Sequence, residues 1–203
     1  MSDNKIIITI GRETGSGGRE IGRMLASRLG IDYYDRELIQ VAAKNSGLCE
    51  EVLESYDERP TSSFLYSLVM DGGTFGSNLP INHKVFLAQF DAIRHIADKG
   101  SCVIVGRCAD YALSEYTNKL SVFITGTMEA KALSISQRNQ LSIDKAKDFV
   151  MKSDKKRANY YNFYTGRQWG HAKTYDLCVN SSNLGYENTV DLIISCLNMK
   201  NSR

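Results

Sequence analysis

A glycine-rich turn near the start of the chain has the composition of a phosphate-binding loop. It follows the β-branched run KIIITI, residues 5–10, and precedes a helical pattern that begins at residue 19. Backbone N–H groups at a helix N-terminus attract anions, and glycine lets the main chain curl closely around one. We therefore expect the turn to bind a phosphate group through five residues: Thr14, Gly15, Ser16, Gly17 and Gly18.

The lysine that such a loop usually carries is absent. In the standard pattern G-x-x-x-x-G-K-[ST], the lysine binds the outer phosphates and the hydroxyl holds Mg²⁺. With Gly17 as the second glycine, the lysine position is Gly18 and the hydroxyl position is Arg19. A cation at a helix N-terminus is unfavourable unless an anion lies beside it. We expect Arg19 to supply the missing charge, with Arg12 and Arg23 as weaker candidates.

Two other functions of the turn stay open. The dinucleotide-binding pattern G-x-G-x-x-G is met by Gly15 and Gly17 but fails at Glu20, which disfavours an oxidoreductase with Asp35 on the ribose. A turn with a purely structural role is the plain alternative. Glu20 suits the first helical turn for electrostatic reasons alone, and it is also a candidate metal ligand.

Strand-like segments alternate with helical ones along the chain and must position this turn. That alternation predicts an α/β fold with a parallel sheet and right-handed crossovers. Ligands of such sheets bind beyond the carboxyl ends of the strands, where the turns GRETGSGG, GRCAD and GTMEA fall. We expect strands at 5–10, 31–35, 101–106, 120–126 and 174–182, and helices at 19–29, 36–47, 48–60, 83–100 and 186–199.

Composition limits the class of protein. The chain has 203 residues, of which 42% are hydrophobic and 24% charged, and its net charge of +2 is too small to indicate a nucleic-acid or membrane partner. It contains no apolar run of about 18 residues and no signal-peptide pattern, so we expect a cytoplasmic protein. The histidines have no metal-ligand spacing. The cysteines are typical of free thiols in a reducing compartment: Cys49, Cys102, Cys108, Cys178 and Cys196.

Five segments spread over almost the whole chain resemble the cytidylate kinase-like family of P-loop proteins. They are GRETGSGGREIGRMLASRLG, YYDRELI, VIVGRCADYAL and KKRANYYNFYTGRQWG with the later YDLCVNSS. The resemblance implies a P-loop kinase fold: a parallel five-stranded sheet flanked by helices, an acceptor-binding insertion and a helical lid. It divides a single domain, 1–203, into a phosphate-binding segment at 1–35, an acceptor-binding insertion at 36–100, core strands at 101–127, a lid at 128–172 and a last strand and helix at 173–203.

The turn VGRCAD resembles the D-G-R-D stretch of cytidylate kinases. The resemblance implies that Arg107 binds the acceptor phosphate and that Gly106 allows its close approach. The two aspartates of that stretch are Val105 and Cys108 here, which removes the acid expected near the metal. Asp110, two residues further on, is the candidate that could compensate as an acceptor or metal ligand.

Other site residues follow from the same resemblance. Asp35 and Arg36 of YYDRELI are placed where the second strand ends and the acceptor-binding insertion begins. Asp154 and Arg157 match the D-x-x-R pattern of the lid, and Arg138 matches a basic residue of the preceding helix. Cations from separate elements that surround one phosphate would stabilise its transfer, so Arg19, Arg107, Arg138 and Arg157 are the candidate catalytic residues.

The lid segment is rich in aromatic residues interleaved with cations. Tyr160, Tyr161 and Arg167 could stack on a nucleobase and grip phosphates. The alternative is that the tyrosines pack the lid against the core, which is the commoner role of aromatic clusters.

The resemblance implies transfer of the γ-phosphoryl group of ATP, with Mg²⁺, to a nucleotide such as CMP or a similar small acceptor. A non-catalytic nucleotide or phosphate sensor on the same scaffold is the alternative, because binding does not require stabilisation of a transition state. We expect a helix followed by a mobile loop at 61–82, where the apolar patch FLYSLVM, residues 64–70, could contact a second copy of the chain.

Overall fold

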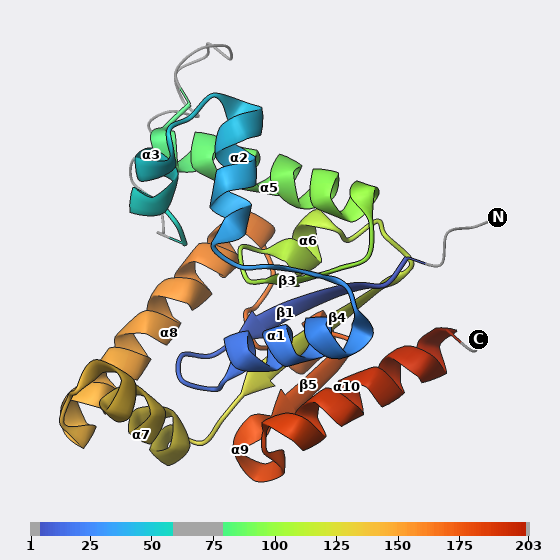
Figure 1. The fold of residues 1–203 in the computed structure, drawn as a ribbon. Helices are drawn as coiled ribbons and strands as arrows, with labels where there is room; N and C mark the ends of the chain where they lie inside the picture. The colour runs from blue at the N-terminus through green and yellow to red at the C-terminus, as the bar shows by residue number, and fades with distance from the viewer. Residues whose placement is uncertain (1–4, 59–78, 202–203) are drawn as a thin grey trace.

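The computed structural model describes residues 5–58 and 79–201. Figure 1 shows one central sheet with helices on both faces and a pair of helices, α7 and α8, at one side. The expected patch FLYSLVM and the loop around it lie outside the described residues. No helix within the described ranges is both long and apolar enough to span a membrane.

The sheet has five strands, all parallel, in the order β2-β3-β1-β4-β5. The predicted parallel five-stranded sheet of a P-loop kinase fold is therefore confirmed. Each strand-like run of the sequence forms a strand, most of them shorter than the run. The strands are β1 (Ile7–Arg12), β2 (Asp32–Tyr34), β3 (Cys102–Val105), β4 (Lys119–Thr125) and β5 (Leu177–Asn180).

Helices cover both faces of the sheet, which explains why the central strands are continuous apolar runs. On β1, Ile8 and Ile10 pack with α1 (Gly18–Leu29) and α10 (Tyr186–Asn201), whereas Ile7 packs on the opposite face. That opposite face is covered by α2 (Glu37–Ser46), α3 (Glu50–Ser55), α5 (Ile81–Lys99) and α6 (Ala109–Ala112).

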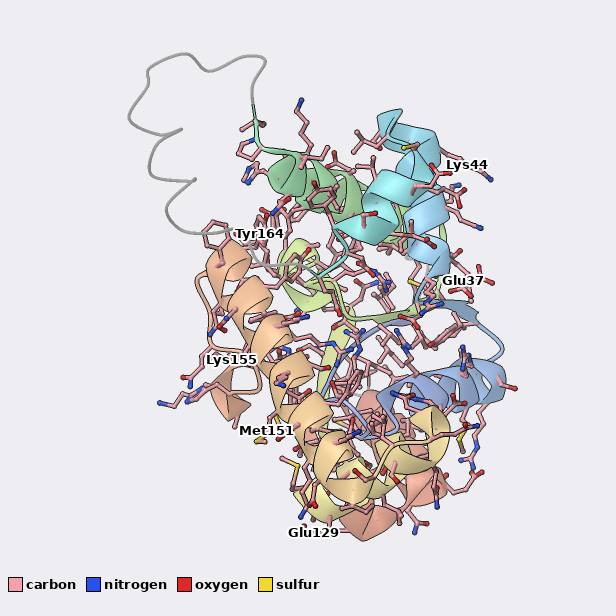
Figure 2. The ribbon with its side chains drawn as sticks, turned by 90° about the vertical axis from the view of Figure 1, so that its left-hand side faces the viewer. Glu37, Lys44, Glu129, Met151, Lys155 and Tyr164 are labelled. Atoms are coloured by element: carbon pink, nitrogen blue, oxygen red, sulfur yellow. The ribbon has the colours of Figure 1, made fainter. Side chains whose placement is uncertain are left out.

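The helices α7 (Met128–Asn139) and α8 (Ile143–Thr165) lie beside the carboxyl ends of the strands. The side chains of Thr127 and Ser142 cap their N-termini. Figure 2 shows α8 running from α7, near Glu129 and Met151, to α5, where Tyr164 lies. The remaining elements are a short 3₁₀ helix, Ala172–Thr174, and α9 (Ser181–Leu184).

The helix expected over 48–60 is shorter than the sequence indicated. It ends at Ser55, and residues 56–58 form a turn in which Glu58 has a φ of +49°. The pattern that suggested a longer helix is acidic rather than apolar, and the carboxylates of the turn are directed to arginines elsewhere in the fold. Because of this turn, Asp57 and Glu58 belong to the site described below.

Candidate functional site

The glycine loop joins β1 to α1, and neighbouring elements approach its backbone closely. Gly15 and Gly17 have φ values of +82° and +76°, in the left-handed region that favours glycine. A Cβ on Gly15 would lie 2.6 Å from the carbonyl oxygen of Lys131, and a Cβ on Gly17 would lie 2.3 Å from the Tyr186 ring. The loop is also held from below, because the Ser181 hydroxyl donates a hydrogen bond to the Ser16 carbonyl oxygen. These glycines are needed where α7 and α10 approach the loop.

A cleft of about 190 Å³ lies over this loop. It brings together several residues predicted from separate stretches of the sequence: the loop glycines, Arg19 and Glu20 of α1, Arg138 of α7 and Arg157 of α8. Ser134 and Tyr186 complete its wall. Arg138 is exposed and forms no ion pair or hydrogen bond with any residue that the structure describes. Arg107 lies elsewhere, in a cluster of ion pairs at the carboxyl end of β3 that is described below.

Two residues of the predicted lid reach the loop directly. The Thr14 backbone N–H donates to Asp154 Oδ1 at 2.7 Å, and Arg157 Nη1 donates to Thr14 Oγ1 at 2.8 Å. The D-x-x-R pair of α8 therefore contacts the glycine loop. One amide of that loop is already hydrogen-bonded to a carboxylate of the chain.

Lys131, on α7, is a residue of this site that sequence reasoning missed. Its ammonium group is buried and binds Glu13 at 2.8 Å and Asp154 at 3.2 Å. Burial alone would lower the pKa of Lys131, but the hydrogen bonds and charges of Glu13 and Asp154 outweigh it and raise that pKa. Lys131 thus links the loop, α7 and α8. In the sequence it is an ordinary helix lysine outside any motif.

Arg107 is the centre of a second cluster, at the carboxyl end of β3. It follows Gly106, and both residues have left-handed backbones, with φ of +52° and +80°. The Arg107 side chain is 1% exposed and donates to Asp35 at 3.0 Å and to both oxygens of Asp57 at 3.0 and 2.7 Å. Burial opposes its charge, but Asp57, Glu58 and Asp35 outweigh that effect and raise the pKa of Arg107.

Glu58 completes this cluster, which we call the arginine cluster: Arg12, Arg107, Arg157, Asp35, Asp57 and Glu58. Glu58 Oε1 accepts from Arg12 at 2.7 Å and from the Arg107 backbone N–H at 3.3 Å, and Oε2 accepts from Arg157 Nε at 3.0 Å. Burial raises the pKa of Glu58, but the three arginines outweigh it and hold that pKa well below its usual value.

Arg19, the predicted substitute for the lysine, borders both regions. It lines the cleft, and its Nε binds Asp35 Oδ2 at 2.8 Å. Asp35 therefore joins Arg19 to Arg107, which places the strand-end aspartate and both arginines in one network. Arg36, the next residue, is exposed before α2 and lies outside that network.

The two candidate metal ligands lie in different places. Glu20 is exposed, lines the cleft and pairs with Arg23 at 3.0 Å. Asp110 is buried and accepts a hydrogen bond from the Tyr161 hydroxyl at 2.5 Å. Burial raises the pKa of Asp110 in spite of that bond. In the described portion of the chain, no three Asp, Glu, His or Cys side chains are grouped so as to hold a metal ion.

The aromatic residues of α8 pack into the fold. Tyr160 and Tyr161 are each 4% exposed, and the Tyr160 hydroxyl donates to Gln89 at 3.2 Å. Arg167 lies over the Tyr111 ring, 5.3 Å from its centroid. In this arrangement Tyr160 and Tyr161 pack against α5 and α6 rather than facing the cleft.

Comparison with known proteins adds the family. The model of the cytidylate kinase-like family matches residues 7–183. The chain belongs to the cytidylate kinase-like family. The resemblance noted in the sequence is therefore confirmed.

The curated relatives that match the chain share little sequence with it. A cytidylate kinase of Saccharolobus islandicus is 26% identical over 123 residues, which cover 61% of this chain and 63% of the relative. A cytidylate kinase of Sulfolobus acidocaldarius is 22% identical over 195 residues, which cover 96% of this chain and 95% of the relative.

Solved structures agree on the fold. An uncharacterized protein from Eubacterium ventriosum is 30% identical, with a TM-score of 0.72 over 96% of this chain and 99% of that one. A shikimate kinase from Bacteroides thetaiotaomicron is 15% identical, with a TM-score of 0.54 over 95% of this chain and 98% of that one. At that identity the second likeness concerns the fold alone.

Proposed function

We propose that this chain is an ATP-dependent phosphotransferase of the nucleoside monophosphate kinase type. It transfers the γ-phosphoryl group of ATP to a nucleotide or a similar small acceptor, and CMP is the first acceptor to test. Membership of the cytidylate kinase-like family and the names of the relatives support this reaction class. The cleft over the glycine loop is the proposed ATP site, and the arginine cluster is the proposed acceptor site.

The observation that carries the proposal is the position of Arg157. One guanidinium group donates both to Thr14 of the loop and to Glu58 of the arginine cluster. A phosphoryl group in transit lies between its donor and its acceptor, and transfer is accelerated by positioning and by cations that neutralise the developing charge. Arg157 contacts both sides of that path, so it is the proposed catalytic cation.

The missing lysine is replaced, in this proposal, by two arginines. Arg157 binds the loop directly, and Arg19 lines the cleft from the first turn of α1. Arg138 faces the same cleft without an ion pair in the described structure and is the third cation available to the phosphate chain. A guanidinium can bind two phosphate oxygens at once, which a lysine cannot do in the same geometry.

Binding of the nucleotide requires one exchange at the loop. Asp154 accepts the Thr14 N–H, and a phosphate oxygen that takes this amide must displace the carboxylate. Mg²⁺, when bound with ATP, would neutralise the phosphate oxygens; it commonly keeps several waters and needs few protein ligands. Glu20 is the proposed protein ligand, because it lines the cleft and is exposed.

The test is ADP formation from ATP and Mg²⁺ with a panel of nucleoside monophosphates, measured for the wild type and for Arg157→Met. We expect CMP-dependent turnover and a loss of about a hundredfold or more in kcat/KM for Arg157→Met. Arg94→Met is the control, because Arg94 pairs with Glu115 on the exposed surface. ATP binding by calorimetry without turnover for any acceptor would instead support the non-catalytic sensor.

A further inference from the structure

The arginine cluster is already filled by carboxylates of the chain. Asp57 binds Arg107 with both oxygens, and Glu58 lies between Arg12 and Arg157. Every nitrogen of the Arg107 guanidinium has a hydrogen-bond acceptor, because Nη1 also donates to Asp35. A substrate anion cannot bind Arg107 in the same fork geometry while Asp57 holds it.

The two carboxylates stand where a phosphate would stand. Arginine binds carboxylates and phosphates through the same parallel N–H···O pairs. Glu58 touches Arg12 and Arg157 on the loop side and the Arg107 backbone N–H on the β3 side. A Cβ on Gly106 would lie 1.9 Å from Arg12 Nη1 and 2.7 Å from Glu58 Oε1. Arg12 and Glu58 can therefore pair beside residue 106 only because it is glycine.

The carboxylates differ in how easily they can leave. Asp35 follows β2 directly, and its side chain is 5% exposed. Asp57 and Glu58 belong to the turn after α3, and their side chains are 21% and 16% exposed. Glu58 has a left-handed backbone, which a residue with a Cβ adopts only at an energetic cost. Its contacts with the arginines offset that cost.

We propose that Asp57 and Glu58 form a carboxylate latch that occupies the acceptor anion site and is displaced by the phosphate group of a phosphate monoester. Asp35 stays in place and keeps Arg107 oriented. A dianionic phosphate that bound the same arginines would lie close to the two carboxylates and be repelled by their charge, so the phosphate and the latch exclude one another. A neutral acceptor offers no charge to replace the carboxylates, so the latch selects acceptors that carry a phosphate. The inference rests on the proposed function for the role of the site.

The test measures anion binding without ATP. Inorganic phosphate and CMP are titrated into the wild type, Glu58→Gln and the control Glu115→Gln, by calorimetry and by thermal unfolding, with sodium chloride at matched ionic strength. We expect Glu58→Gln to bind phosphate about tenfold tighter or more than the wild type, because the competing carboxylate is gone. Glu115→Gln removes an exposed partner of Arg94 and should bind as the wild type does.

Thermal unfolding gives a second readout of the same competition. Glu58→Gln leaves arginines without their partner, so its Tm should fall in chloride and recover in phosphate by more than the wild-type Tm rises. Should Glu58→Gln fail to fold, Asp57→Asn is measured in the same way, with a gain in phosphate affinity again expected.

Equal phosphate affinity in the wild type and the latch variants would overturn the proposal. Weaker phosphate binding in Glu58→Gln would overturn it too, because Glu58 would then support the anion rather than compete with it. No ADP formation with any acceptor, together with the expected gain in phosphate affinity for Glu58→Gln, would reject phosphoryl transfer and support the latch. CMP-dependent turnover without a gain in phosphate affinity for Glu58→Gln would support phosphoryl transfer and reject the latch.

Discussion

The cleft over the glycine loop and the arginine cluster hold positive charge in opposite ways. The cleft has a volume of about 190 Å³ and presents backbone amides, the half-exposed Arg19 and the unpaired Arg138 of the described structure. The arginine cluster borders a cavity of only about 20 Å³, and each of its arginines already faces a carboxylate. An anion that binds the Thr14 amide of the cleft displaces one carboxylate, that of Asp154, whereas an anion that binds the arginine cluster must displace the carboxylates that already pair with its arginines.

The difference shows how burial determines whether an arginine needs an anionic partner. An exposed arginine is hydrated and needs no partner, but a buried one must be paired, since an isolated buried charge is strongly unfavourable. Arg157 lies between these cases, with 21% of its side chain exposed and with contacts to Thr14 and Glu58. Four variants test this contrast.

The largest effect is expected for Arg107→Met. This change leaves Asp35 and Asp57 without their buried partner, and we expect a loss of about 3 to 5 kcal/mol in the free energy of unfolding, measured in urea. Arg94→Met, which removes the exposed partner of Glu115, should cost less than about 1 kcal/mol. Similar losses for the two variants would mean that the cluster is not paired in solution as described.

Gly15→Ala tests the backbone of the cleft. The new Cβ meets the Lys131 carbonyl at 2.6 Å in a left-handed conformation, so we expect a loss of about 2 to 3 kcal/mol and weaker ATP binding. Gly30→Ala is the matched control: its φ is +64°, but nothing lies within 4 Å of its Cβ. It should cost about 1 kcal/mol and leave ATP binding unchanged. Both variants are measured by calorimetry and by urea unfolding. The comparison separates the cost of a left-handed backbone, which both share, from the steric clash with Lys131, which only Gly15→Ala has.

Lys131→Met tests the buried cation beneath the loop. Glu13 and Asp154 lose their shared partner, so we expect a loss of about 1 to 3 kcal/mol in urea unfolding. Lys155→Met is the control, because Lys155 is exposed on the same helix as Asp154 and points away from the protein (Figure 2). It should change stability by less than about 0.5 kcal/mol. A loss of stability no greater for Lys131→Met than for Lys155→Met would contradict a stabilising role for the ion pairs of Lys131 with Glu13 and Asp154.

The smallest effect on stability is expected for Arg138→Ala. Arg138 has no partner among the described residues, so the free energy of unfolding should change by less than about 0.5 kcal/mol. ATP affinity should nevertheless fall by about threefold to tenfold, because the cleft loses one cation. Gln137→Ala, also exposed on α7, should leave both quantities unchanged. Unaltered ATP affinity in Arg138→Ala would remove this residue from the site.

Sequence patterns were sufficient for the strands and for some residues of the candidate site, whereas α7 and α8 were expected only as a helical lid that the family resemblance implied. The β-branched runs are the strands, because strands covered on both faces contain few polar residues. The resemblance of VGRCAD to the D-G-R-D stretch pointed to Arg107, and its place after β3 agrees with the rule that ligands bind beyond the carboxyl ends of parallel strands. The contact of Arg157 with Thr14 joins residues 143 positions apart, and the lid pattern only indicated it.

Other features of the site had no local signal. Lys131 lies in a helix with an ordinary composition, and its buried side chain acquires a role only because the fold places it beside Glu13 and Asp154. Glu58 belongs to an acidic stretch that looked like the end of a helix, and its meaning comes from arginines on three other elements. The role of Asp154 at the loop amide depends on the path of α8, which sequence periodicity does not give.

The length of α8 has a mechanical consequence. Its 23 residues span about 35 Å, and its C-terminal end is anchored by Tyr160 and Tyr161 in the fold and by Tyr164, whose ring stacks on Phe86 at 4.2 Å. Arg157 is about 5 Å along the helix axis from Tyr160, the first of these anchoring residues, whereas the first residue of α8, Ile143, is about 26 Å from Tyr160. A tilt of about 10° therefore shifts Arg157 by about 1 Å and the far end by about 4 to 5 Å. Movement of α8 about its anchored end would therefore be large at its first turn and small at Arg157.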